Sequence, residues 1–168
     1  MLDDRFLETI SARLSAVSGV RWEVVELDGG RLGVEVIFAD GHRTEMRVTR
    51  DSTPASKVDV QFIGHSRSDV ELLLLAVRGK MVLSPEEIAS IEARCRAASP
   101  APWRAFIEAD GGIGGCDVIQ VSDQDDELDL YLWFEPGLVD LAPSADFRFV
   151  ASARQDIPDL IAAVTGQR

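Results

Sequence analysis

ISARLSAVSGVRW, at residues 10–22, is the stretch that decides the fold, because IEARCRAASPAPW at residues 91–103 repeats it. Six of the thirteen aligned positions are identical: Ile10/Ile91, Ala12/Ala93, Arg13/Arg94, Ala16/Ala97, Ser18/Ser99 and Trp22/Trp103. Two unrelated segments of ordinary composition would share about one identity over this length. Self-similarity of this kind predicts an internal duplication.

A second matched block lies at the other end of each half. Residues 59–77 align with residues 146–164 and share Asp59/Asp146, Phe62/Phe149, Arg67/Arg154, Asp69/Asp156, Leu73/Leu160, Ala76/Ala163 and Val77/Val164. The blocks follow one another in the same order in both halves. The sequence therefore predicts two tandem copies of one module, residues 1–80 and 81–168, compatible with a single compact unit.

Each copy is predicted to have the element order α-β-β-β-β-α. First helices are expected over 3–17 and 85–98, the second introduced by SPEE at residues 84–87, which matches a capping box with proline at the first helical position. The predicted strands are 21–27, 32–38, 42–49 and 58–63 in the first copy, and 103–109, 116–122, 128–134 and 147–150 in the second.

Turn and helix signals complete the module. The pair Asp40-Gly41 predicts a tight hairpin. Apolar residues at i, i+3, i+4 and i+7 predict final helices that begin near Asp69 and Asp156, with Pro158 in the first turn of the second. The fold class that follows is α+β, with antiparallel sheets that carry helices on one face.

Repeated side chains outside the periodic pattern have structural interpretations. Trp22 and Trp103 recur at equivalent positions, which favours packing of helix on sheet. Arg67 and Arg154 recur as well, and an ion pair to Asp59 or Asp146 is the expected role.

Composition and charge restrict the function. The chain of 168 residues is 46% hydrophobic and 27% charged, with a formal net charge of −12. Such a charge repels nucleic-acid phosphates and anionic lipid, so neither nucleic acid nor a membrane is an expected partner. The N-terminus resembles no signal peptide, and Cys95 and Cys116 have no disulfide or metal spacing, which favours a cytoplasmic location.

No catalytic, metal or cofactor site is recognisable. His42 and His65 are the only histidines, and no nucleophile elbow accompanies them. The glycine-rich residues 111–115 lack the Lys-Ser/Thr of a phosphate loop and precede no predicted helix. In the segment that begins at Asp123, a calcium loop would need Gly where Leu128 stands and Glu where Phe134 stands. The sequence thus predicts neither an enzyme nor a cofactor.

The most distinctive charged feature is the acidic run of residues 123–129. Together with two aromatic residues of the following strand it forms the predicted partner-binding site: Asp123, Asp125, Asp126, Glu127, Asp129, Tyr131 and Trp133. Acidic and exposed aromatic side chains suit an interface with a basic protein. The alternative interpretation of the run is a solvated turn between two strands.

The second copy carries a familiar signature. SPAPWRAFIE at residues 99–108, followed by ADFRFVASARQDIPDL at residues 145–160, resembles a module of small uncharacterised bacterial immunity-like proteins. The resemblance covers about half of the chain, and the first copy departs from it at Gly64, His65 and Glu71. It implies an acidic antidote that binds a cognate toxin domain, and it brings no catalytic motif.

The expected function is therefore a non-catalytic acidic binding protein, in the first place an immunity protein that neutralises a basic toxin domain by direct binding. A homo-oligomeric structural or adaptor protein, for example a homodimer, is the alternative. An enzyme that uses His42 or His65 is the third interpretation.

Overall fold

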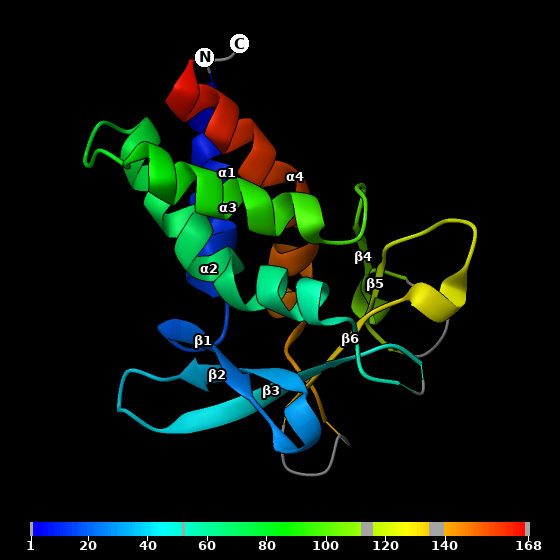
Figure 1. Cartoon of the computed structure of the whole chain (residues 1–168). Helices are drawn as coiled ribbons and strands as arrows, with labels where there is room; N and C mark the ends of the chain where they lie inside the picture. The colour runs from blue at the N-terminus through cyan, green and yellow to red at the C-terminus, as the bar shows by residue number, and fades with distance from the viewer. Residues whose placement is uncertain (1, 52, 112–115, 135–139, 167–168) are drawn as a thin grey trace.

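The computed structural model describes residues 2–51, 53–111, 116–134 and 140–166, and Figure 1 traces the chain. Its α-helices are α1 (Asp4–Ala16), α2 (Lys57–Val77), α3 (Pro85–Ala97) and α4 (Ser144–Thr165). Its strands are β1 (Arg21–Glu26), β2 (Leu32–Ile37), β3 (Arg43–Thr49), β4 (Arg104–Phe106), β5 (Val118–Gln120), β6 (Tyr131–Phe134) and β7 (Asp140–Leu141). Short 3-10 turns are η1 (Asp28–Gly30), η2 (Glu108–Asp110) and η3 (Asp126–Leu128).

The strands form two antiparallel sheets. One has the order β1-β2-β3-β6-β7, and the other pairs β4 with β5. Strand β6 pairs with β3 from Met46↔Phe134 to Thr49↔Tyr131, so strands from the two halves of the sequence share one sheet. A single bridge, Ile119↔Leu130, connects β5 to the start of β6.

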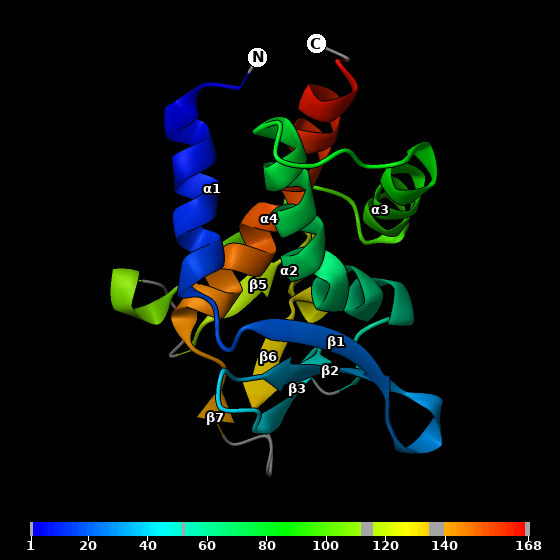
Figure 2. The ribbon, with the colours of Figure 1, turned by 90° about the vertical axis from the view of Figure 1, so that its left-hand side faces the viewer.

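The helices lie together on one side of the larger sheet, and its opposite side faces away from them (Figures 1 and 2). Helix α2 contacts β1 and β2 as well as the other three helices. The buried side chains of the sheet alternate along the strands, as a half-covered sheet requires: Trp22, Val34, Val36, Met46, Val48 and Leu132. The protein is thus α+β, as predicted.

Local signals predicted several elements correctly. The first helices end within a residue of the predicted bounds, and Ser84 and Glu87 form the predicted capping box. The Asp40-Gly41 turn joins β2 to β3, with Gly41 at φ +89°. Trp22 and Trp103 are buried, as expected, and pack edge-on against Phe149 and Phe62 respectively.

The predicted fourth strands were wrong. Residues 58–63 and 147–150 belong to helices α2 and α4, which begin at Lys57 and Ser144. Asp69 and Asp156 therefore lie in the middle of these helices, and Pro158 is inside α4 rather than in its first turn. The buried face of α2 contains Asp59, Ser66 and Asp69, and these polar residues interrupt the apolar periodicity from which a helix is recognised.

The predicted boundary between residues 80 and 81 falls in the exposed connection from α2 to α3. On either side of it, the halves share one hydrophobic core, and α2 packs along α4. Among the described helices, none combines the length and the apolar character that a membrane span requires.

Candidate functional site

The acidic run forms a surface loop between β5 and β6. Its exposed members are Asp123, Asp125, Asp126 and Glu127, whereas Asp129 is half-buried. The 3-10 turn η3 organises the loop, and the Asp125 carboxylate accepts a hydrogen bond from the Glu127 amide at 2.9 Å. We call residues 123–129 the acidic loop.

The two predicted aromatic residues follow on β6. Tyr131 and Trp133 are neighbours on one face of the strand, with ring centroids 6.2 Å apart. Both are half-buried rather than exposed, which corrects the expectation of a fully exposed pair. The indole Nε1 of Trp133 donates a hydrogen bond to Thr49 Oγ1 at 2.8 Å, so this ring is held against β3.

Negative charge gathers around Tyr131. Partial burial raises the pKa of its hydroxyl, and Cys116, Asp129, Asp51 and Asp126 add to the shift by their charges. Burial also raises the pKa of Asp129, and the neighbouring carboxylates of the acidic loop reinforce it. The carboxylates of the acidic loop therefore interact electrostatically with one another and with Tyr131.

A hollow of about 340 Å³ adjoins the acidic loop. Asp123 and Leu128 line it from the loop, and Pro100 and Pro102 line it from the segment that leads into β4. Arg104 lines it as well, so its walls carry one acidic and one basic side chain among apolar and small polar ones. The loop is therefore backed by a recess, not by a flat surface.

The histidines lie apart from each other and from the acidic loop. His42 is in the β2–β3 turn, stacked on Phe38, with Nδ1 2.5 Å from Asp40 Oδ1. His65 is in α2, where burial first and the charge of Arg94 second lower its pKa. Within the residues that the structure describes, no group of His, Cys, Asp and Glu could hold a metal ion.

The cysteines are free thiols, and the structure describes only part of the glycine-rich segment. Cys95 is a buried free thiol whose pKa burial raises, and Cys116 is a half-buried free thiol. Of the glycine-rich residues, only Gly111 is described, at φ +87°, and residues 112–115 lie outside the described part of the chain.

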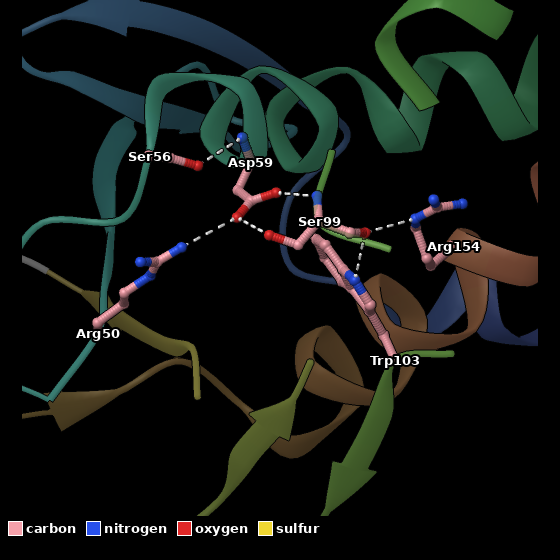
Figure 3. A network of polar contacts seen from close by, with 6 residues as sticks. All are labelled: Arg50, Ser56, Asp59, Ser99, Trp103 and Arg154. Carbon is pink, nitrogen blue, oxygen red and sulfur yellow. Dashed lines mark hydrogen bonds and ion pairs between the residues drawn. The ribbon is translucent and has the colours of Figure 1, made fainter. Parts of the chain in front are cut away.

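The most developed polar arrangement connects α2 with the turn after α3 (Figure 3). Asp59, fully buried, accepts hydrogen bonds from the amide and the hydroxyl of Ser99, both at 2.7 Å. The Ser99 carbonyl in turn accepts from Trp103 Nε1 at 3.0 Å and from Arg154 Nε at 3.1 Å. Arg50 Nη2 lies 3.8 Å from Asp59 Oδ2, the oxygen that also accepts the hydrogen bond from the Ser99 hydroxyl.

An equivalent arrangement connects α4 with the turn after α1. Asp146, also fully buried, accepts a hydrogen bond from the Ser18 amide at 2.8 Å. The Ser18 carbonyl accepts from Trp22 Nε1 at 2.9 Å and from Arg67 Nη1 at 3.4 Å. Burial raises the pKa of Asp146, and the bond from Ser18 and the charge of Arg67 oppose the shift.

A third matched set joins the helices further along. Arg94 of α3 holds Asp69 of α2 with two hydrogen bonds, at 2.7 and 3.2 Å. Arg13 of α1 holds Asp156 of α4 at 2.8 Å and also donates to Ser152 Oγ at 3.0 Å. Burial raises the pKa of Asp156 to about 6, although the charge of Arg13 opposes the shift.

These networks were not predicted from the sequence. The sequence predicts ion pairs between the repeated arginines and Asp59 or Asp146, whereas Arg67 and Arg154 donate hydrogen bonds to serine carbonyls. The repeat itself contains the signal, because the matched Ser, Trp, Arg and Asp positions are the ones that meet. The burial of their aspartates and tryptophans assigns them to the interior of the fold rather than to a binding surface, although Asp146 Oδ2 and Arg13 Nε have no hydrogen-bond partner among the described residues.

The comparisons with known proteins give no match for this chain among protein-family models, curated proteins or solved structures.

Proposed function

We propose that this chain is a non-catalytic acidic binding protein that neutralises a basic bacterial toxin domain by direct binding, as an immunity protein does. The observation that carries the proposal is the acidic loop, whose exposed carboxylates gather on one surface turn beside Tyr131, with Asp123 lining an adjoining recess. The placement of the histidines, each engaged by its local surroundings, supports a function without catalysis.

Physical chemistry favours a basic protein as the partner. A net charge of −12 accelerates association with a cationic surface and disfavours anionic ligands. Carboxylates on a short, hydrogen-bonded turn lose less conformational entropy on binding than those on an unstructured tail. Tyr131 beside the acidic loop offers an apolar contact at the edge of the charged surface, which is typical of energetic centres of interfaces.

We also propose that the architecture arose by duplication of an α-β-β-β-α unit, to which the second half adds the short strand β7. The support comes from the matched contacts, in which each half supplies the aspartate to the other half's serine turn, Asp59 to Ser99 and Asp146 to Ser18. The ion pairs Arg13–Asp156 and Arg94–Asp69 also each join an arginine of one half to an aspartate of the other. In this unit the predicted fourth strand is replaced by the first turns of the final helix.

The test is affinity capture of the tagged chain from its native host, with washes at low and then high salt. We expect one stoichiometric basic protein that salt releases and that is toxic when expressed alone. The charge-reversal variant Asp126→Lys/Glu127→Lys should lose this partner at low salt. It leaves Asp125 intact, because that carboxylate caps η3.

A matched control is Glu8→Lys/Glu26→Lys, which makes the same change of charge at exposed positions on α1 and β1. We expect it to retain the partner, because the acidic loop is intact. If both double variants lost the partner equally, the interaction would depend on net charge alone, and the assignment of the acidic loop as the binding surface would be wrong. Recovery of the chain alone would contradict the proposal and favour the homo-oligomeric structural alternative.

A further inference from the structure

A second hollow, of about 240 Å³, opens on the sheet face that is turned away from the helices. It lies over β3 and β6, where Arg47 is paired directly opposite Trp133. The turn between β1 and β2 and the segment after β3 complete its walls. Its principal lining residues are Leu27, Arg31, Arg47, Arg50, Pro54 and Trp133.

The charge of this hollow is opposite to that of the molecule. Three arginines against one aspartate, Asp51, give its lining residues a formal charge of +2 in a chain with a net charge of −12, and carboxylates outside the lining pair with two of them, Glu45 with Arg47 and Asp59 with Arg50. Concentrating cations at one place in an acidic protein keeps that place attractive to an anion at short range, while the remaining surface repels anions. The hollow therefore differs in kind from the acidic loop.

The polar groups of the hollow are held in place. Arg31 Nε donates to the Asp28 carbonyl at 3.3 Å, and the Trp133 indole is tied to Thr49. The guanidinium of Arg50 is oriented by buried Asp59 at 3.8 Å, as Figure 3 shows. Among the described residues, the buried Nε of Arg50 has no hydrogen-bond acceptor.

An unsatisfied donor in a hollow that a second guanidinium, Arg31, also lines points to oxygen atoms of a ligand as the missing acceptors. The planar fork of arginine matches a carboxylate, to which it donates two parallel hydrogen bonds. The apolar part of the lining, from Leu27, Pro54 and the Trp133 ring, matches an aliphatic or aromatic group. The volume is below the range of about 300–1,000 Å³ that is typical of drug-sized ligands, which limits the ligand to a few carbon atoms beyond the carboxylate.

We infer that this hollow binds a carboxylate that carries an apolar group of the size of a leucine side chain. The carboxylate meets Arg31 and Arg50, and the apolar group packs against Trp133. A free small acid and the C-terminal residue of a peptide share this chemistry. The site shares Trp133 with the predicted partner-binding site but contains no residue of the acidic loop.

The experiment is a calorimetric titration of the full chain with N-acetyl-leucine, compared with N-acetyl-leucinamide, which has the same shape without the charge. We expect the acid to bind and the amide to bind about tenfold more weakly or not at all. Arg31→Gln should weaken binding of the acid by about tenfold, and Arg31→Lys should restore only part of it, because lysine keeps the charge but not the fork.

Arg21→Gln is the matched control, because Arg21 is exposed on neighbouring β1 and does not line the hollow. It should leave the affinity unchanged. Equal affinity for acid and amide, equal binding by Arg31→Gln, or no binding of the acid up to about 10 mM would overturn the inference. A pentapeptide with a free C-terminal leucine that binds more tightly than N-acetyl-leucine identifies a chain end as the ligand, and equal affinity identifies a small acid.

Discussion

Buried aspartates are the residues that organise this interior. Asp59 and Asp146 are fully buried, and each accepts the backbone amide of a serine from a distant turn. A carboxylate removed from water requires such donors, since an unpaired buried charge is costly. The serine turns are therefore held in place by side chains that lie 40 and 128 positions away in the sequence.

Asp156 makes the stability depend on pH. Its pKa in the folded protein is about 6, above the ordinary value of 3.8, so the folded state binds the proton more tightly than the unfolded state. Lowering the pH through 6 towards 3.8 should therefore stabilise the fold, by about 3 kcal/mol in full and about 1.4 kcal/mol by pH 5. Asp156→Asn should remove this contribution.

Chemical denaturation at pH 7.5 and pH 5 measures the effect. The difference in unfolding free energy between the two pH values should shift by about 1.4 kcal/mol in Asp156→Asn relative to the unmodified chain. Asp28→Asn removes a carboxylate at an exposed position and serves as the control. An unchanged pH dependence in Asp156→Asn would show that Arg13 compensates fully for the burial.

At the scale of elements, the close approach of α2 to the sheet depends on one glycine. A Cβ atom at Gly64 would lie 2.4 Å from Val24 Cγ2 and 3.3 Å from Val34 Cγ2. In the second half, Ala151 of α4 and Ala105 of β4 stand at the matched positions and line a common hollow. One half thus combines glycine with valine, and the other combines two alanines.

The contact between Gly64 and Val24 can be tested by substituting both residues. Gly64→Ala should destabilise the fold by about 1–3 kcal/mol, because overpacking outweighs the better helix propensity of alanine. Gly64→Ala/Val24→Ala should recover part of this loss, with a coupling energy of about 1 kcal/mol or more in a double-mutant cycle measured by urea unfolding. Strictly additive effects of the two substitutions would argue against a direct contact.

At the scale of the molecule, the two halves of the chain depend on each other. Strands β3 and β6 join them in one sheet, α2 packs on α4, and the buried aspartates pair across the boundary. The connection from α2 to α3 is exposed, with Val82 at 94% exposure. A break there should leave the shared core intact.

We expect a chain cut at a protease site introduced at residues 79–82 to remain one particle. Size-exclusion chromatography should give the elution volume of the uncut chain, and near-ultraviolet circular dichroism should retain the tryptophan signals. Residues 1–80 expressed alone should show no cooperative unfolding, because Asp59 then lacks its Ser99 donors. Two folded, separable halves after cutting would contradict a shared core.

The sequence by itself determined the elements whose signals are local. The first helices, the capping box at Ser84 and the Asp40-Gly41 hairpin follow from periodicity, capping and turn chemistry within a few residues. Only the tertiary structure decided the length of α2 and α4, because their buried faces include aspartates that donors from the other half satisfy. It alone also decided the pairing of β3 with β6, and with it the place of Trp133 in the arginine-lined hollow, since the paired residues lie more than eighty positions apart and no local pattern encodes such distances.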